Sequence, residues 1–140
     1  MHILGIDYGD SRIGVAKSDA LEWLGQGIET IKNNGGNRKP IERIVQIVEQ
    51  YDIKTIVVGY PKNMNGTVGP KALIVQEFID QLSEALPDAK IIKWDERLTT
   101  VAASRTMHEL NIKTSKKKSI VDQIAAVYIL QGYLDSKLNR

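Results

Sequence analysis

The stretch "HILGIDYGDSRIGVAKSD", residues 2–19, decides the fold, because it places two apolar segments on either side of a very short turn. Residues 2–8 and 12–19 are both rich in the apolar and β-branched residues typical of strands. Only Gly9, Asp10 and Ser11 separate them. A connection this short predicts an antiparallel hairpin at the start of the chain.

After the hairpin, the spacing of apolar residues changes between strand and helix patterns. Further strands are predicted at residues 25–33, 54–59 and 90–94. Helices are predicted from Pro40 to Tyr51, around residues 75–86, from about residue 100 to 110, and from about residue 119 to 138. This order predicts an α/β fold whose mixed sheet begins as an antiparallel meander and continues with parallel strands. No linker or repeat divides residues 1–140, so we expect a single domain.

The composition excludes several classes of protein. Among the 140 residues there is no cysteine and there are only two histidines, so neither a disulfide framework nor a zinc cluster is expected. No apolar run approaches the roughly 18 residues of a membrane span, and no secretory signal is visible. We therefore expect a cytoplasmic protein with no membrane partner. The net charge of +2 leaves a polyanionic partner open.

Three acids stand at positions that favour chemistry, and each has a simpler structural interpretation. Asp7 lies near the end of the first strand, where it could also bond the backbone of the turn. Glu96 follows the fifth strand, at the edge where open α/β sheets bind ligands, but it could pair with Arg97. Asp122 lies three residues after Ser119, so it could serve only as part of a helix cap.

Together, the three acids indicate a metal site. Carboxylates that converge without a countercharge repel one another, and the pKa of at least one of them rises. A divalent cation removes this repulsion, and Mg²⁺ prefers a few carboxylates together with water and phosphate oxygens. Two such ions can activate water and stabilise the leaving oxygen of a phosphodiester. This chemistry requires neither cysteine nor histidine.

Four stretches carry a resemblance to a known family. They are "GIDYGDSRIGVAKSD" (5–19), "VVGYPKNMNGTVGP" (57–70), "DERLTT" (95–100) and "KSIVDQIAAVYILQGYL" (118–134). The chain resembles the YqgF/RuvX proteins, within the RNase H-like nucleases that include the RuvC junction resolvases. The resemblance implies an RNase H-like fold with a five-stranded mixed sheet of order 3-2-1-4-5, flanked by helices. It also implies Asp7, Glu96 and Asp122 as catalytic acids and as ligands of Mg²⁺ or Mn²⁺.

The resemblance further implies a metal-dependent nuclease, a hydrolase that acts in ribosome biogenesis. Two substrates are open: precursor ribosomal RNA, trimmed near the 5′ end of 16S rRNA, or four-way Holliday junction DNA. We expect the RNA role and a monomer or weak homodimer, whereas a junction resolvase should be dimeric. Two other classes of function stay open. One is a nucleotide-binding protein, because sugar kinases open with a similar Asp-x-Gly turn, and the other is an RNA-binding module without catalytic activity.

Substrate contacts are expected around the acids. Arg97 is predicted to hold a phosphate or to orient a carboxylate. Asn65 and Gly66 belong to a loop that either contacts the substrate or only connects a strand to a helix. The lysines just before Asp122 are expected to attract the nucleic-acid backbone, although such a run can also be a solvated surface. These lysines are Lys116, Lys117 and Lys118.

Overall fold

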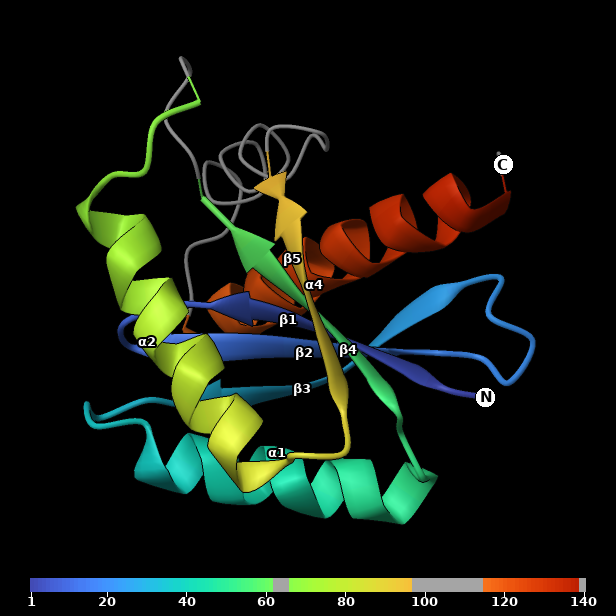
Figure 1. Cartoon of the computed structure of the whole chain (residues 1–140), viewed down its shortest axis with the longest axis horizontal. Coiled ribbons are helices and arrows are strands. Elements are labelled where there is room, and N and C mark those ends of the chain that lie inside the picture. Colours follow the sequence, from blue (N-terminus) through green and yellow to red (C-terminus); the bar gives the residue numbers. More distant parts are fainter. Residues whose placement is uncertain (62–65, 97–114, 139–140) are drawn as a thin grey trace.

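One five-stranded sheet organises the chain (Figure 1). The computed structural model describes residues 1–61, 66–96 and 115–138. The strands lie in the order β3-β2-β1-β4-β5, which confirms the predicted order. Their bounds are β1 Ile3–Tyr8, β2 Arg12–Ser18, β3 Gly25–Lys32, β4 Thr55–Tyr60 and β5 Lys90–Asp95.

The pairing of the strands confirms the predicted mixed sheet. Strands β1 and β2 form the expected antiparallel hairpin, in which Asp7 lies opposite Gly14. Strand β3 continues the antiparallel part along β2. On its other side β1 pairs in parallel with β4, and β4 pairs in parallel with β5. Strand β1 therefore occupies the centre of the sheet, between an antiparallel and a parallel neighbour.

Helices cover both faces of the sheet (Figure 1). Helices α1 (Arg38–Tyr51) and α2 (Pro70–Ala85) pack on one face, where residues such as Ile6, Ile47 and Phe78 form the larger part of the core. Helix α4 (Ser115–Leu138) covers the other face and forms a second core with side chains such as Val57. In the described part of the chain, no helix is both long and apolar enough to cross a membrane.

The last helix begins earlier than its apolar pattern indicates. It was expected from about Ser119, with that residue as a possible N-cap for Asp122, but α4 begins at Ser115. The capping interpretation is therefore wrong, because Ser119 lies inside the helix. Lysine is a good helix former, so a run of lysines extends the helix beyond its apolar residues. The helix predicted at residues 100–110 lies outside the described residues.

Helix α4 approaches the sheet closely because several facing strand positions, Gly5 and Gly14 among them, carry no side chain. A Cβ atom built on Gly14 would lie 2.0 Å from the backbone oxygen of Asp122. A Cβ on Gly5 would lie 2.6 Å from Cβ of Leu130. Separations this short are forbidden, so only glycine allows the helix to lie where it does.

We predict that Gly14→Ala lowers the free energy of unfolding by about 1–3 kcal/mol, the usual range for overpacking against a rigid neighbour. Denaturation by urea measures the effect. The matched control is Gly25→Ala, since a Cβ there would lie 3.1 Å from Cδ2, the end of the Leu130 side chain, and would meet no backbone atom as closely. Equal effects of the two changes would contradict the proposed role of Gly14.

Candidate active site

Asp7 lies in strand β1 and points toward helix α4. Ile3 belongs to the core beneath α4, and Asp7 follows it at an even spacing, so both side chains lie on the same face of the sheet. The residue is only 4% exposed. Asp7 pairs with Gly14 inside the ladder and is not part of the turn, so the interpretation as a turn residue does not describe its position.

A buried polar network holds the end of β1 from the opposite face. The Tyr8 hydroxyl donates to Oδ1 of Asn37 at 2.5 Å. Nδ2 of Asn33 donates to the Tyr8 hydroxyl at 3.1 Å and to the carbonyl of Gly9 at 3.2 Å. Nδ2 of Asn37 donates to Oε1 of Gln81 on α2 at 2.7 Å. These bonds fix the hairpin turn and the residue next to Asp7.

Helix α4 brings Asp122 to the position beside Asp7. The contact with Gly14 places the backbone of Asp122 directly over the residue that pairs with Asp7. Asp122 is 8% exposed, and its Oδ2 accepts a hydrogen bond from Nε of Arg12 at 2.5 Å. The charge of this buried carboxylate is thus balanced by a side chain from the start of β2.

Glu96 reaches the same face from the other side of Asp7. A Cβ on Gly59 would lie 2.7 Å from Oε1 of Glu96 and 2.5 Å from Cδ1 of Ile129 on α4. The missing side chain of Gly59 therefore makes room for the Glu96 carboxyl group. Burial raises the pKa of Glu96, the positive charge of Lys71 lowers it, and the negative charge of Asp95 raises it further.

The three acids lie at one end of the sheet, on the face under α4. Because Ile6 pairs with Val58, the next residues on these strands are Asp7 and Gly59. Asp7 therefore lies between two glycine positions, one covered by Asp122 and the other by Glu96. Sequence alone did not show that these glycines create the space for two of the acids.

The donor set fits a hard divalent cation, since carboxylate oxygens are the ligands that Mg²⁺ and Mn²⁺ prefer. In residues 1–61, 66–96 and 115–138, however, no three acidic or histidine side chains lie close enough together to hold one ion. The carboxylate of Asp122 is instead bonded to Arg12. The acids are thus on one face and at one end of the sheet, without forming a closed cage.

The predicted substrate residues are placed only in part. Arg97 and Asn65 lie outside the described residues, whereas Gly66 is exposed and has a φ of 86°, which favours glycine. Lys116, Lys117 and Lys118 fall within the first turns of α4, not in a loop before it. Arg12 was not identified from the sequence. The sequence signal that could have found it is its even spacing from Gly14 on the same strand, which puts both residues on one face of the sheet.

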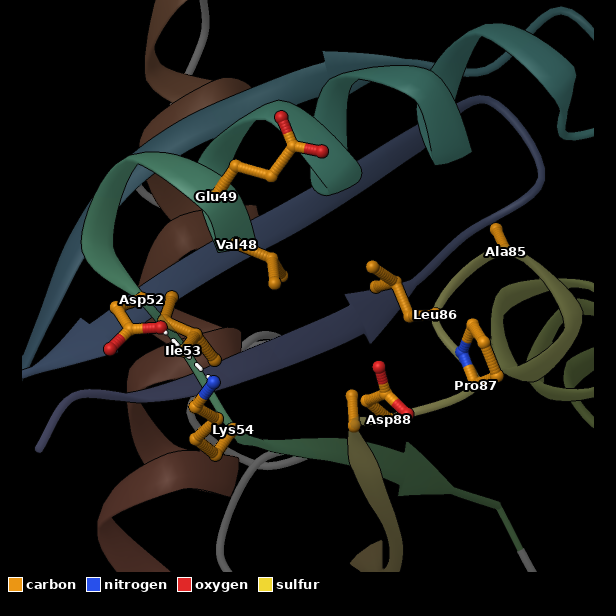
Figure 2. A pocket seen from close by; sticks show the side chains of 10 residues that line it. Val48, Glu49, Asp52, Ile53, Lys54, Ala85, Leu86, Pro87 and Asp88 are labelled. Carbon is orange, nitrogen blue, oxygen red and sulfur yellow. Dashed lines mark ion pairs between the residues drawn. The ribbon is translucent and has the colours of Figure 1, made fainter.

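A pocket of about 280 Å³ lies at the opposite end of β4 and β5 (Figure 2). Val48 and Glu49 of α1 line it together with Leu86 and Pro87, which follow α2. Lys54 comes immediately before β4, whereas Gly59 is near the end of that strand. The pocket and the acids are therefore separate.

Comparison with known proteins adds the family. The model of the family described as "RuvX: Holliday junction resolvase" matches residues 1–136. The chain belongs to the RuvX family. A relative from Acetivibrio thermocellus is 61% identical over 98% of this RuvX chain and 97% of its own length. One from Clostridium tetani is 53% identical over the full length of both chains. Both relatives carry the name "Putative pre-16S rRNA nuclease".

Solved structures confirm the RNase H-like fold of this RuvX chain. Thermus thermophilus RuvC, solved in complex with a Holliday junction substrate, superposes with a TM-score of 0.63 at 10% identity and covers 99% of this chain and 96% of its own. The fowlpox virus Holliday junction resolvase gives a TM-score of 0.53 at 17% identity, over 97% of this chain and 99% of its own. At these identities the likeness concerns the fold alone.

The raised pKa of Glu96 predicts a dependence of stability on pH when metal is removed by EDTA. The stability that neutral Glu96 provides is fully present below its ordinary pKa of 4.5 and is lost as the pH rises through the higher pKa of the folded state. Glutamine does not ionise, so Glu96→Gln does not lose stability in this way as the pH rises. We therefore predict that the variant is more stable than wild type at pH 7.5 and that the difference shrinks toward pH 4.

Urea denaturation at the two pH values measures this difference. Glu77→Gln, which changes an exposed glutamate on α2, is the control and should shift stability by less than about 0.5 kcal/mol at either pH. A destabilised Glu96→Gln variant at pH 7.5 would show that the charged carboxylate is favoured in its site.

Proposed function

We propose that this RuvX chain acts in the cytoplasm, as a single domain, as a metal-dependent nuclease that trims the 5′ end of precursor 16S rRNA. The observation that carries the proposal is that Asp7, Glu96 and Asp122 lie on the same face and at the same end of the sheet, under α4. The family and the names of the relatives support a nuclease and an RNA substrate.

In this proposal the three carboxylates hold Mg²⁺ or Mn²⁺. The bound ions would lower the pKa of the attacking water and stabilise the charge on the leaving oxygen. Asp7 is best placed to contribute to binding from the centre, because it lies between the other two acids. The glycines at positions 14 and 59 act as positioning residues, since they leave the space that Asp122 and Glu96 occupy.

Other residues would bind the substrate beside the acids. Arg97 follows Glu96 directly and would hold a phosphate through its planar guanidinium group. Asn65 and Gly66 come shortly after β4, the strand that carries Gly59, and would contact the substrate from that loop. The lysine run of α4 begins six residues before Asp122 and would attract the nucleic-acid backbone.

A second candidate substrate is four-way junction DNA. The description of the family names a Holliday junction resolvase, and the fold is that of RuvC. Phosphate contacts position RNA and DNA backbones alike, so the acidic site does not discriminate between the two polymers. A resolvase needs two sites for symmetric strands and should be dimeric, whereas RNA trimming can be performed by a monomer or weak homodimer.

We predict that Asp7→Asn and Asp122→Asn each reduce the rate of cleavage at least about a hundredfold and leave the fold intact. Each change removes an anionic ligand with little change in shape, and metal assistance supplies several kcal/mol of transition-state stabilisation. Glu96→Gln should have the same effect. Single-turnover cleavage with Mg²⁺ or Mn²⁺ measures it, and circular dichroism checks the fold. Near wild-type rates for any one variant would remove that residue from the metal site.

The substrate is tested with matched single-stranded RNA containing the 5′ precursor end of 16S rRNA, the same sequence as single-stranded DNA, and a four-way DNA junction. Each is incubated with Mg²⁺, Mn²⁺ or EDTA. We expect cleavage of the RNA with either metal and none with EDTA. Cleavage of the junction alone, by a dimeric protein, would favour the second candidate. Cleavage in EDTA would contradict the dependence on metal.

The lysine run gives a further prediction. Replacing Lys116, Lys117 and Lys118 together by Ala should weaken RNA binding about equally across sequences, because phosphate contacts carry no sequence information. Alanine keeps the helix propensity high, so α4 should remain folded. The dependence of log K on log salt should flatten by roughly 0.7 per lost contact. An unchanged salt slope would show that these lysines only form a solvated surface and do not bind the RNA.

A further inference from the structure

The bond between Arg12 and Asp122 joins two residues that are 110 positions apart in the sequence. Arg12 is the first residue of β2, and its even spacing from Gly14 and Ala16 puts it on the face covered by α4. Its side chain is 39% exposed, whereas that of Asp122 is 11% exposed. Arg12 therefore extends from the edge of the site toward a buried carboxylate that we have proposed as a metal ligand.

The geometry of this pair differs from that of a second arginine pair, which joins helix α1 to strand β3. Arg43 on α1 donates two hydrogen bonds to the carboxylate of Glu29 on β3, from Nε at 2.8 Å and from Nη2 at 2.7 Å. Arg12 uses Nε alone. Among the described residues, its two terminal nitrogens have no hydrogen-bond partner. Pairs joined by two parallel bonds are stronger than pairs joined by one. Arg12 therefore binds Asp122 less strongly than its guanidinium group could.

We propose that Arg12 is an internal counter-ion of Asp122, which competes with the divalent cation for this carboxylate and, once displaced, holds a phosphate of the bound nucleic acid. The proposal rests on the proposed function, because it assumes that Asp122 belongs to the metal site. It gives the buried side chain of Asp122 a countercharge beside Asp7 before a metal is bound, since an unpaired buried charge is strongly disfavoured.

A phosphate is the anion that suits the displaced side chain. Guanidinium groups bind phosphate with two parallel bonds, and the terminal nitrogens of Arg12 are the donors for such a pair. The position of Arg12 at the partly exposed edge lets it reach a backbone outside the buried site. One residue would thus neutralise Asp122 in the metal-free protein and bind substrate in the loaded enzyme.

Because of these two roles, changing Arg12 should strengthen the binding of metal and weaken the binding of RNA. Arg12→Gln removes the competing charge, so its Kd for Mn²⁺ alone, measured by titration calorimetry, should fall about threefold to fivefold relative to wild type. At saturating Mn²⁺, the KM for single-stranded RNA should rise roughly tenfold, because a charge-assisted contact is lost. If Arg12 only orients Asp122 as a ligand, binding of the metal should weaken together with binding of the RNA.

Two variants serve as controls. Arg43→Gln removes the same charge from a side chain that is 40% exposed, and should leave the Kd for Mn²⁺ unchanged. Arg12→Lys keeps the charge without the planar group, so it should bind Mn²⁺ like wild type and recover only part of the affinity for RNA.

The wild-type protein provides a test that does not depend on a variant that folds. The Nε proton of Arg12, followed by nuclear magnetic resonance, should exchange slowly with water in EDTA and faster at saturating Mg²⁺, when Asp122 no longer accepts its bond. Unchanged protection with Mg²⁺ bound would overturn the proposed displacement, and so would an equal or higher Kd for Mn²⁺ in Arg12→Gln.

Failure of the proposed metal site can be distinguished from failure of the proposed role of Arg12. If wild type binds no Mn²⁺, or if Asp122→Asn binds it as tightly as wild type, the metal site at Asp122 is wrong and the role of Arg12 falls with it. If wild type binds Mn²⁺, Asp122→Asn does not, and Arg12→Gln binds equally or more weakly, the metal site stands and only the role of Arg12 is overturned.

Discussion

The contact between helix α4 and the glycine positions of the sheet is the constraint on which the rest of the site depends. Side chains normally keep a helix well away from the strands that it covers. Here the backbone oxygen of Asp122 occupies the space in which a Cβ of Gly14 would lie. Because Gly14 pairs with Asp7, the same contact that docks the helix also brings an acid of α4 beside an acid of β1. The packing of α4 and the formation of the acidic site therefore both require a glycine at position 14.

The close approach has an electrostatic consequence. Carboxylates near one end of the sheet are taken out of water, and each must be balanced or remain protonated. The structure shows two solutions. Asp122 is balanced by Arg12, whereas burial raises the pKa of Glu96. A protein that keeps such groups gives up stability in its metal-free form for the sake of function, a common trade at active sites.

The elements with regular apolar patterns could be predicted from the sequence. The hairpin of β1 and β2 followed from two apolar segments and a short turn, and the crossover strands followed from their β-branched runs. The start of α4 could not be read in this way, because its first turns carry lysines and no apolar stripe. Apolar periodicity reports which residues are buried, and it is silent on turns of helix that extend beyond the core.

The site could be predicted only as a set of acids. Their positions at a strand end or near a helix start indicated convergence, but the bond from Arg12 to Asp122 joins residues 110 positions apart. No local spacing predicts such a pair. The roles of Gly14 and Gly59 were also hidden, because a glycine in a strand is explained only when the group that fills its space is known.

The most direct test of the central claim is a crystal structure of the protein soaked with Mn²⁺, with anomalous diffraction recorded at the manganese edge. We expect an anomalous peak under the N-terminal part of α4, within coordination distance of carboxylate oxygens from Asp7 and from Asp122 or Glu96. A fully occupied Mn²⁺ site elsewhere, with no peak beside Asp7, would contradict the account.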